Sequence, residues 1–209
     1  MIYDDMTSKV AKALVASTMF ALIATLMVSS TPAYAINGHG VSYGPSFGGE
    51  LVKYTNGLKI NGMPFDISEF TQTIPTQTLY VNNPSDITLK IYDKAGPQSI
   101  KDVTIYMNLQ GNDPSVTKSD TKIEWNKVNG VSSTDPGKIF KSVTAKLTVD
   151  KTNTFAWIHF KIVPQGTMKT TDLIVRAYDT NLATGQAIIL NAINIGYPPA
   201  GGFSDNTAS

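Results

Sequence analysis

The residues of this sequence that could do acid–base or metal chemistry are few and widely spaced. Its two histidines are His39 and His159, and it has no cysteine. The absence of cysteine excludes disulfides, zinc–thiolate sites, iron–sulfur clusters, type 1 copper centres and thiol nucleophiles. Catalysis also needs a nucleophile or an acid–base group with partners that converge on it. Because no nucleophile–base pair is evident, the sequence predicts a protein that is not an enzyme and needs no cofactor.

One stretch, Gly44-Pro45-Ser46-Phe47-Gly48, matches the Gly-x-Ser-x-Gly nucleophile elbow of α/β-hydrolases. An elbow needs a buried strand before the serine and a helix after it. Here the chain is rich in glycine on both sides of Ser46, a composition that disfavours a helix. We therefore interpret residues Ile36 to Gly49 as an extended N-terminal arm, and we expect replacement of Ser46 to leave any activity intact.

His39 is a candidate metal ligand whose geometry depends on where the mature chain begins. A chain trimmed to Asn37 would start Asn37-Gly38-His39. Its amine, two amides and imidazole can bind Cu(II) or Ni(II) in a square plane. Cleavage after Ala35 would place His39 fourth and disrupt that geometry. A metal site at His39 is therefore an alternative and not the main interpretation.

Two predicted strands carry the candidate residues for contact with a ligand or a partner. On the first, His159 and Trp157 share a face opposite apolar neighbours, so strand alternation turns both toward solvent or a partner. On the second, Arg176, which is the single arginine, shares a face with Tyr178. The favoured role of Arg176 is a structural ion pair with a carboxylate, and binding of an anionic ligand is the alternative.

Calcium and carbohydrate are further alternative ligands. The aspartates fall mostly in turns, where carboxylates cap backbone amides, and none forms an Asp-x-Asp-x-Asp-Gly calcium loop. Strand aromatics would be the platforms for a sugar, although isolated strand aromatics more often serve packing. The aspartates are Asp113, Asp120, Asp135, Asp150, Asp172 and Asp179, and the aromatic residues are Trp125, Trp157, Tyr92, Tyr106 and Tyr178.

The elements that must position these residues begin with a secretory signal in the first 35 residues. Lys9 and Lys12 precede an apolar run from Ala13 to Val28, and Ala33-Tyr34-Ala35 has the small-x-small pattern of a cleavage site. The apolar run is shorter than the roughly 20 residues that span a bilayer. We expect cleavage after Ala35, a secreted protein of the extracellular space or cell envelope, and no membrane span after cleavage.

After the arm, apolar and polar residues alternate with the period of two that is typical of half-buried strands. The clearest case is Val143 to Val149, followed by a turn and a returning strand from Phe155 to Val163. Asn56-Gly57 and Asn61-Gly62 each predict a type I′ turn beside the short strand from Leu58 to Ile60. No window shows the apolar stripe of a helix. We count eight to ten strands and predict an all-β fold, an antiparallel two-sheet β-sandwich of the Ig-like or jelly-roll-like kind.

The predicted organisation has four parts: a signal peptide at 1–35, a glycine-rich arm at 36–49, the β-sandwich at 50–196 and a flexible tail at 197–209. The last strand of the sandwich is apolar on both faces at Ile188, Ile189 and Leu190. We expect a second layer or a neighbouring molecule to cover this strand, and we assign the three residues to assembly.

The charge balance excludes some partners. The chain has 17 lysines and arginines against 16 aspartates and glutamates, a formal net charge of +1. Such a balance produces no strong field to attract nucleic acid or an anionic membrane. The expected partners are therefore another protein or a second copy of this chain.

Six stretches of the mature chain carry a resemblance to known proteins: Pro45 to Gly49, Phe65 to Leu79, Ile87 to Gly96, Ser142 to Ala145, Ile162 to Pro164 and Asp172 to Ala177. On these stretches the chain resembles a group of uncharacterised secreted proteins from ammonia-oxidising archaea. The resemblance implies an exported, envelope-associated β domain of unknown role, and it supplies no catalytic residues. Some of these proteins end in a hydrophobic sorting tail, and from this sequence we expect none.

Two functions of different classes follow. The first is a non-enzymatic structural or adhesive module that acts by protein–protein contact, in which the arm adds to the sheet edge of the next subunit and builds filaments. The second is an extracellular module that binds carbohydrate or metal through turn aspartates and exposed aromatic residues at the loop end of the sandwich.

Overall fold

The computed structural model of the chain describes residues 44–48, 56–109 and 114–200. The predicted signal peptide, residues 36–43 of the arm and the tail from residue 201 lie outside the described residues. The described chain contains thirteen strands and two short 3-10 helices, η1 (Pro97–Ser99) and η2 (Val116–Lys118). No described helix combines the length and the apolar character that a membrane crossing requires.

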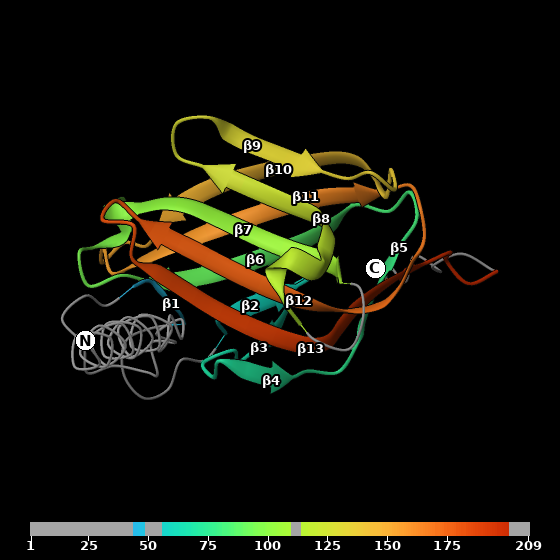
Figure 1. The fold of residues 1–209 in the computed structure, drawn as a ribbon, viewed down its shortest axis with the longest axis horizontal. Helices are drawn as coiled ribbons and strands as arrows, with labels where there is room; N and C mark the ends of the chain where they lie inside the picture. The colour runs from blue at the N-terminus through green and yellow to red at the C-terminus, as the bar shows by residue number, and fades with distance from the viewer. Residues whose placement is uncertain (1–43, 49–55, 110–113, 201–209) are drawn as a thin grey trace, which may run out of the picture. The chain divides into compact units, whose positions relative to one another are not determined.

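The first sheet has six strands in the order β10-β11-β6-β2-β3, and β1 also pairs with β6 (Figure 1). All of its pairs are antiparallel. Asn61 and Gly62, which join β2 to β3, have φ angles of 50° and 82°, so the type I′ turn predicted there is confirmed. The type I′ turn predicted at Asn56-Gly57 is wrong, because Asn56 has a positive φ of 69° but Gly57 does not have a positive φ. The strands are β1 (Ser46–Phe47), β2 (Leu58–Ile60), β3 (Met63–Phe65), β6 (Ser85–Tyr92), β10 (Phe140–Val149) and β11 (Phe155–Pro164).

The second sheet has seven strands in the order β4-β13-β12-β7-β8-β9, and β5 also pairs with β13. Its pairs are antiparallel except that β13 runs parallel to β4 and to β5. The strands are β4 (Thr71–Thr73), β5 (Gln77–Tyr80), β7 (Ile100–Leu109), β8 (Ser119–Asn126), β9 (Gly130–Thr134), β12 (Met168–Asp179) and β13 (Thr184–Gly196).

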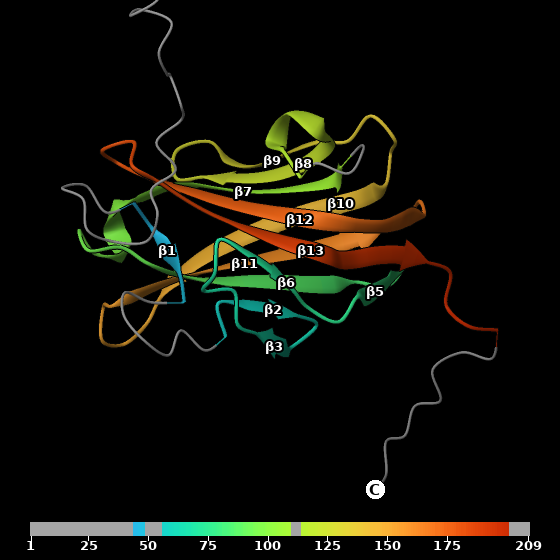
Figure 2. The same cartoon turned by 60° about the horizontal axis from the view of Figure 1, so that its bottom comes forward.

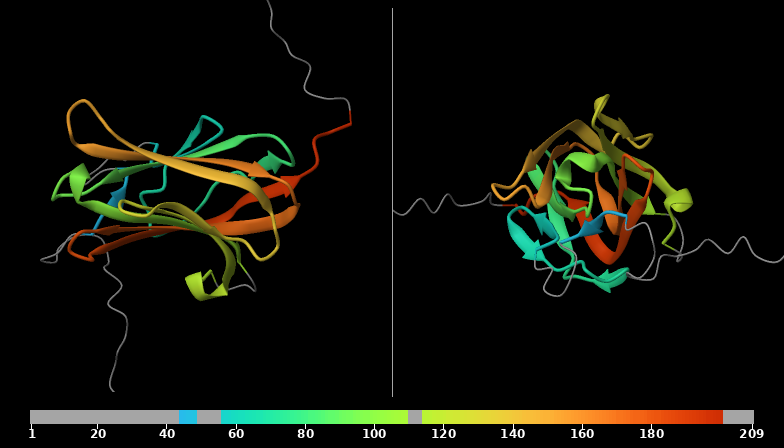
Figure 3. Two further views of the ribbon diagram at one scale, coloured as in Figure 1. Left: turned by 90° about the horizontal axis from the view of Figure 1, so that it is seen from above. Right: turned by 90° about the vertical axis from the view of Figure 1, so that its left-hand side faces the viewer.

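The core lies between the two sheets, which Figure 3 shows as two layers, with the orange hairpin of β10 and β11 in one and the red strand β13 in the other. Alternate residues of each long strand enter it: Ile158 and Phe160 of β11 and Val103 and Ile105 of β7 are fully buried. The predicted all-β two-sheet sandwich is confirmed. It has more strands than expected because the described chain also forms β1, β4 and β5, each of two to four residues.

The described part of the predicted arm belongs to the sandwich. Phe47 pairs with Ile91 of β6 and is 4% exposed, as part of the core. Figure 2 shows its strand β1 in blue. Before it, Pro45 crosses directly over Gly185 of β13, where any Cβ atom would overlap the Pro45 carbonyl oxygen. The expectation of a free arm over residues 36–49 is therefore wrong for residues 44–48. Glycine and proline disfavour a helix here, as the sequence indicated. Burial of the apolar Phe47 side chain nevertheless stabilises the packing of this segment against the sandwich.

The assignment of Ile188, Ile189 and Leu190 to assembly is also corrected. Ile188 is 6% exposed and Ile189 is fully buried. The strand β13 lies between β12 and β4, with Ile188 opposite Thr71. Its two apolar faces are thus explained within the chain, because the strand is flanked on both sides and its side chains are buried at Ile188 and Ile189. Leu190 is half-buried.

Candidate functional site

The outer face of the six-stranded sheet gathers lysines and aromatic rings from four neighbouring strands. In register, Trp157 of β11 lies opposite Lys90 of β6, and His159 opposite Thr88. We call this surface the lysine–aromatic face. Its members are Lys59 of β2, Asp86, Thr88, Lys90 and Tyr92 of β6, Phe155, Trp157, His159 and Lys161 of β11, and Lys146 of β10.

Trp157 is the centre of this face. The Lys59 and Lys90 ammonium nitrogens lie 5.3 Å and 5.6 Å from its ring centroid. The Lys90 ammonium also lies 4.0 Å from the centroid of Phe155, whose ring meets that of Tyr92 edge to face at 6.0 Å. Cation–π attraction therefore holds two positive charges beside one aromatic cluster.

His159 is held within a polar row across three strands. Its Nδ1 lies 3.0 Å from the Thr88 hydroxyl of β6, and its Nε2 lies 3.4 Å from the Thr148 hydroxyl of β10. A neutral imidazole can donate to one hydroxyl and accept from the other. His159 faces outward, as the alternation predicted, but both ring nitrogens already have partners.

The outer face of the seven-stranded sheet holds Arg176 in a different environment. Its Nε donates to the Gln186 side-chain oxygen at 3.0 Å, and its Nη1 donates to the Tyr178 hydroxyl at 3.2 Å. Its guanidinium carbon lies 5.8 Å from the ring centroid of Tyr106. The expected carboxylate partner is therefore replaced by an amide and a phenol. Arg176 and Tyr178 are brought together, but they bind each other.

The carboxylates of this second face are likewise paired. Asp102 accepts hydrogen bonds from Thr104 at 3.0 Å and from Asn126 at 3.3 Å. Burial raises the pKa of Asp102 above its usual range, and the nearby charge of Glu124 adds to the effect. Glu124 itself forms a 3.0 Å ion pair with Lys122, and this hydrogen bond raises the pKa of Lys122.

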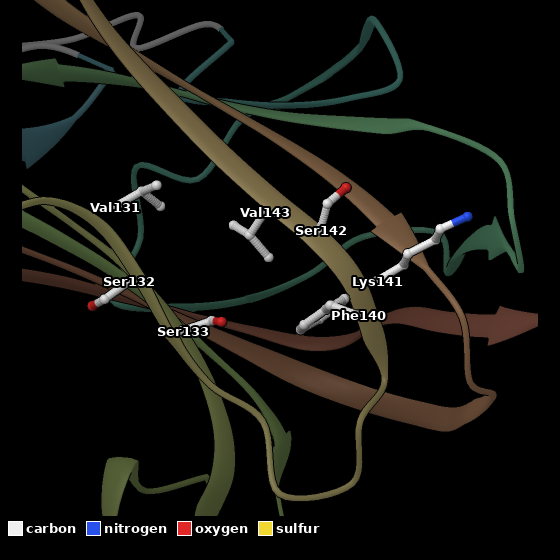
Figure 4. A pocket seen from close by; sticks show the side chains of 7 residues that line it. All are labelled: Val131, Ser132, Ser133, Phe140, Lys141, Ser142 and Val143. Atoms are coloured by element: carbon white, nitrogen blue, oxygen red, sulfur yellow. The ribbon is translucent and has the colours of Figure 1, made fainter.

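A cleft of about 290 Å³ lies where the two sheets separate at β9 and β10, the strands that end their respective sheets (Figure 4). Within the described chain, β10 pairs with β11 alone and β9 with β8 alone. The inward residues Val143, Ala145 and Leu147 of β10 are only half-buried as a result. The lining residues are Val131, Ser132, Ser133, Phe140, Lys141, Ser142 and Val143.

Three of the predicted turn aspartates, Asp135, Asp150 and Asp179, cap backbone amides of the turns that follow them. The turn position is wrong for Asp120 and Asp172, which lie within β8 and β12, and Asp113 lies outside the described residues. Asp150 accepts from the N–H groups of Thr154 and Phe155, and Asp179 accepts from those of Asn181 and Ala183. Among the residues that the structure describes, no three histidine, aspartate or glutamate side chains are grouped to hold a metal ion. His39 lies outside the described residues.

Comparison with known proteins does not assign a family. No protein-family model matches the chain, and no curated protein matches it. One similar solved chain comes from a photo-crosslinking study of multimeric cell-adhesive interactions of VGSC beta subunits. Its TM-score is 0.35 with 8% identity, over 62% of this chain and 95% of that chain. A likeness at this level says nothing about function, which must be argued from the geometry.

Sequence reasoning identified Trp157 and His159 but missed the residues that complete their surface. Lys90 occupies a polar position in the alternating pattern of β6, so the sequence could predict that its side chain points outward. What was missing is that β6 lies beside β11, a pairing between distant parts of the chain. Lys59 and Phe155 were missed for the same reason, while Tyr92 was named as a candidate aromatic platform but was not placed beside Trp157.

Proposed function

We propose that this protein is a non-enzymatic structural or adhesive module of the cell exterior, and that it acts by protein–protein contact at the free edge of β10. The observation that carries the proposal is this ten-residue strand, which pairs on one side only within the described chain and borders the cleft to β9. An unpaired edge presents a row of N–H and C=O groups to which another extended segment can add.

The occupant that fits is the segment 36–43 of a second copy. Because β1 is already built into its own sandwich, these eight residues are what remains of the arm to reach a neighbour. Eight extended residues span about 26 Å, enough to follow most of β10. The segment contains no lysine, arginine, aspartate or glutamate, so its burial leaves no unpaired formal charge. Repeated head-to-tail addition of this kind builds filaments.

The edge also carries features that restrict which strand can add. Lys141 and Lys146 of β10 are exposed, and lysines on edge strands oppose indiscriminate pairing. Val143 lines the cleft from the same strand, so an added strand would find an apolar contact there. Together they favour a specific segment over random association.

The test is sedimentation across a protein concentration series. The chain from Ile36 should form assemblies that grow with concentration, and the chain from Gly44, which keeps β1, should remain a monomer. Val143→Asp should also prevent assembly, because it places a charge in the cleft, whereas Thr144→Asp, on the outward face of the same strand, should not. Thermal melting of each variant confirms that it is folded.

Two outcomes overturn the proposal. If the chains from Ile36 and from Gly44 form the same species, strand donation by residues 36–43 is wrong. If every form stays monomeric at all concentrations, self-assembly is wrong altogether. Secretion is tested separately by sequencing the N-terminus of the exported protein, which should begin at Ile36.

A further inference from the structure

The geometry points to a second binding site, separate from the β10 edge: the lysine–aromatic face is a docking surface for an acidic polysaccharide. The first observation is its charge. Lys59, Lys90, Lys146 and Lys161 share the face with the carboxylate of Asp86, in a chain whose overall charge is +1. Positive charge is therefore concentrated on this side of the sandwich.

The second observation is that these charges lack internal partners. In the described part of the chain, none of the four ammonium groups forms an ion pair or a hydrogen bond, and Lys59 and Lys90 contact only aromatic rings. Asp86, the single carboxylate here, accepts a hydrogen bond from Thr88 at 2.9 Å. Aromatic rings position Lys59 and Lys90, and all four ammonium groups remain available to an external anion.

The third observation is the layout of the surface. The order β10-β11-β6-β2 sets Lys146 and Lys59 three strand spacings apart, about 14 Å at the usual separation of strands. Trp157 and His159 lie on β11 between these two ends. A linear polyanion lying across the strands would meet a cation at each end and an aromatic ring between them.

The aromatic residues decide between classes of polyanion. Tyr92, Phe155 and Trp157 are half-buried, so parts of their rings reach the surface. The apolar faces of sugar rings stack on such side chains, while compact lysine ammonium groups attract carboxylate or sulfate without a fixed geometry. An acidic peptide would need the lysines alone. Nucleic acid requires a larger positive field than this chain has.

The test is isothermal titration of the chain from Ile36 with four probes: a hexauronate from alginate, a sulfated hexasaccharide from heparin, neutral maltohexaose and hexaglutamate. We expect at least one acidic sugar to bind, and the two acidic probes distinguish carboxylate from sulfate recognition. Maltohexaose and hexaglutamate should bind at least about tenfold more weakly. Salt at about 0.15 M should weaken binding because it screens exposed charges.

Matched variants locate the site. Lys59→Gln with Lys90→Gln should lower the affinity at least about tenfold, and Trp157→Leu should lower it without changing the charge. Lys118→Gln with Lys169→Gln removes the same charge from exposed positions outside this face and should change the affinity less than about twofold. If the first pair disturbs folding, Lys146→Gln with Lys161→Gln tests the same face at fully exposed positions.

Three results would overturn the inference. The first is no binding of either acidic sugar at low salt, and the second is binding of hexaglutamate as tight as that of the acidic sugars. The third is a loss of affinity in the Lys118 and Lys169 control as large as that in the Lys59 and Lys90 variant. Failure here is distinguishable from failure of the assembly proposal. Lys59→Gln with Lys90→Gln should leave sedimentation unchanged, and Val143→Asp should leave sugar binding unchanged.

Discussion

Arg176 and Lys90 occupy corresponding places on the two outer faces of the sandwich, each a cation on a central strand beside aromatic rings. Arg176 donates to Gln186 and Tyr178 within its own sheet. Lys90 contacts the rings of Phe155 and Trp157 and no anion in the described chain. Arg176 has its hydrogen-bond partners within its own sheet, and Lys90 keeps a charge that an external group can use.

This difference separates a structural surface from a binding surface. A closed hydrogen-bond network stabilises the sheet and leaves few donors for a ligand. A face with positioned but unpaired cations contributes less to stability and loses less when a ligand arrives, because no internal bonds must break. Substitutions around Arg176 should therefore mainly lower stability, and substitutions on the lysine–aromatic face should mainly lower ligand affinity.

The largest effect is expected for Arg176→Ala. It removes the hydrogen bonds to Gln186 and Tyr178 and leaves half-buried polar atoms without partners, at a cost of about 1–3 kcal/mol. Lys161→Ala, an exposed lysine of the other face, should change stability by less than about 0.5 kcal/mol. Urea unfolding measures both. Equal losses in the two variants would contradict the distinction between the faces.

The next effect concerns Trp157 and Lys90. A double-mutant cycle with Trp157→Leu and Lys90→Met should give a coupling free energy of about 0.5–1 kcal/mol, the usual strength of an exposed cation–π contact. A coupling near zero would mean that the ring does not position the lysine. The docking geometry of the lysine–aromatic face would then lose its support.

A smaller effect is expected from the ion pair on the opposite face. Glu124→Gln removes the charged partner of Lys122. Because both side chains are partly exposed, the free energy of unfolding should fall by at most about 0.5 kcal/mol. The loss should shrink as salt is added. A larger loss that salt does not affect would show that this pair is part of the rigid network around Asp102.

The smallest effect on stability is expected from the Asp150 carboxylate, and it is detected through its dependence on pH. Hydrogen bonds from the Thr152 hydroxyl and the Phe155 N–H lower the pKa of Asp150 from 3.8 to about 2. Because the folded pKa lies below the unfolded one, the stabilisation is complete above about pH 4 and is lost as the pH falls toward 2. The difference in melting temperature between wild type and Asp150→Asn should narrow over that range. A constant difference would show that the carboxylate charge plays no part.

Several features could be predicted from single strands. The alternation along Phe155 to Val163 placed Ile158 and Phe160 inside and His159 outside, and Asn61-Gly62 placed a hairpin turn. Both are local: the period of two is a property of one strand, and positive φ angles are a property of the turn residues. The burial of Phe47 was not local, because it depends on β6 and on a close approach to β13.

The sequence by itself determined the all-β class, the two-sheet architecture and the face to which side chains point in clearly alternating strands such as β10 and β11, because these follow from periodicity and composition. Only the tertiary structure decided which strands are neighbours, and so which side chains meet. Strand order thus placed Lys59 and Lys90 beside Trp157, placed Gln186 within hydrogen-bond distance of Arg176 and covered Ile188. Among the described strands, it also left one edge of β10 unpaired. Pairing between distant strands depends on the packing of the whole chain, which no local pattern encodes.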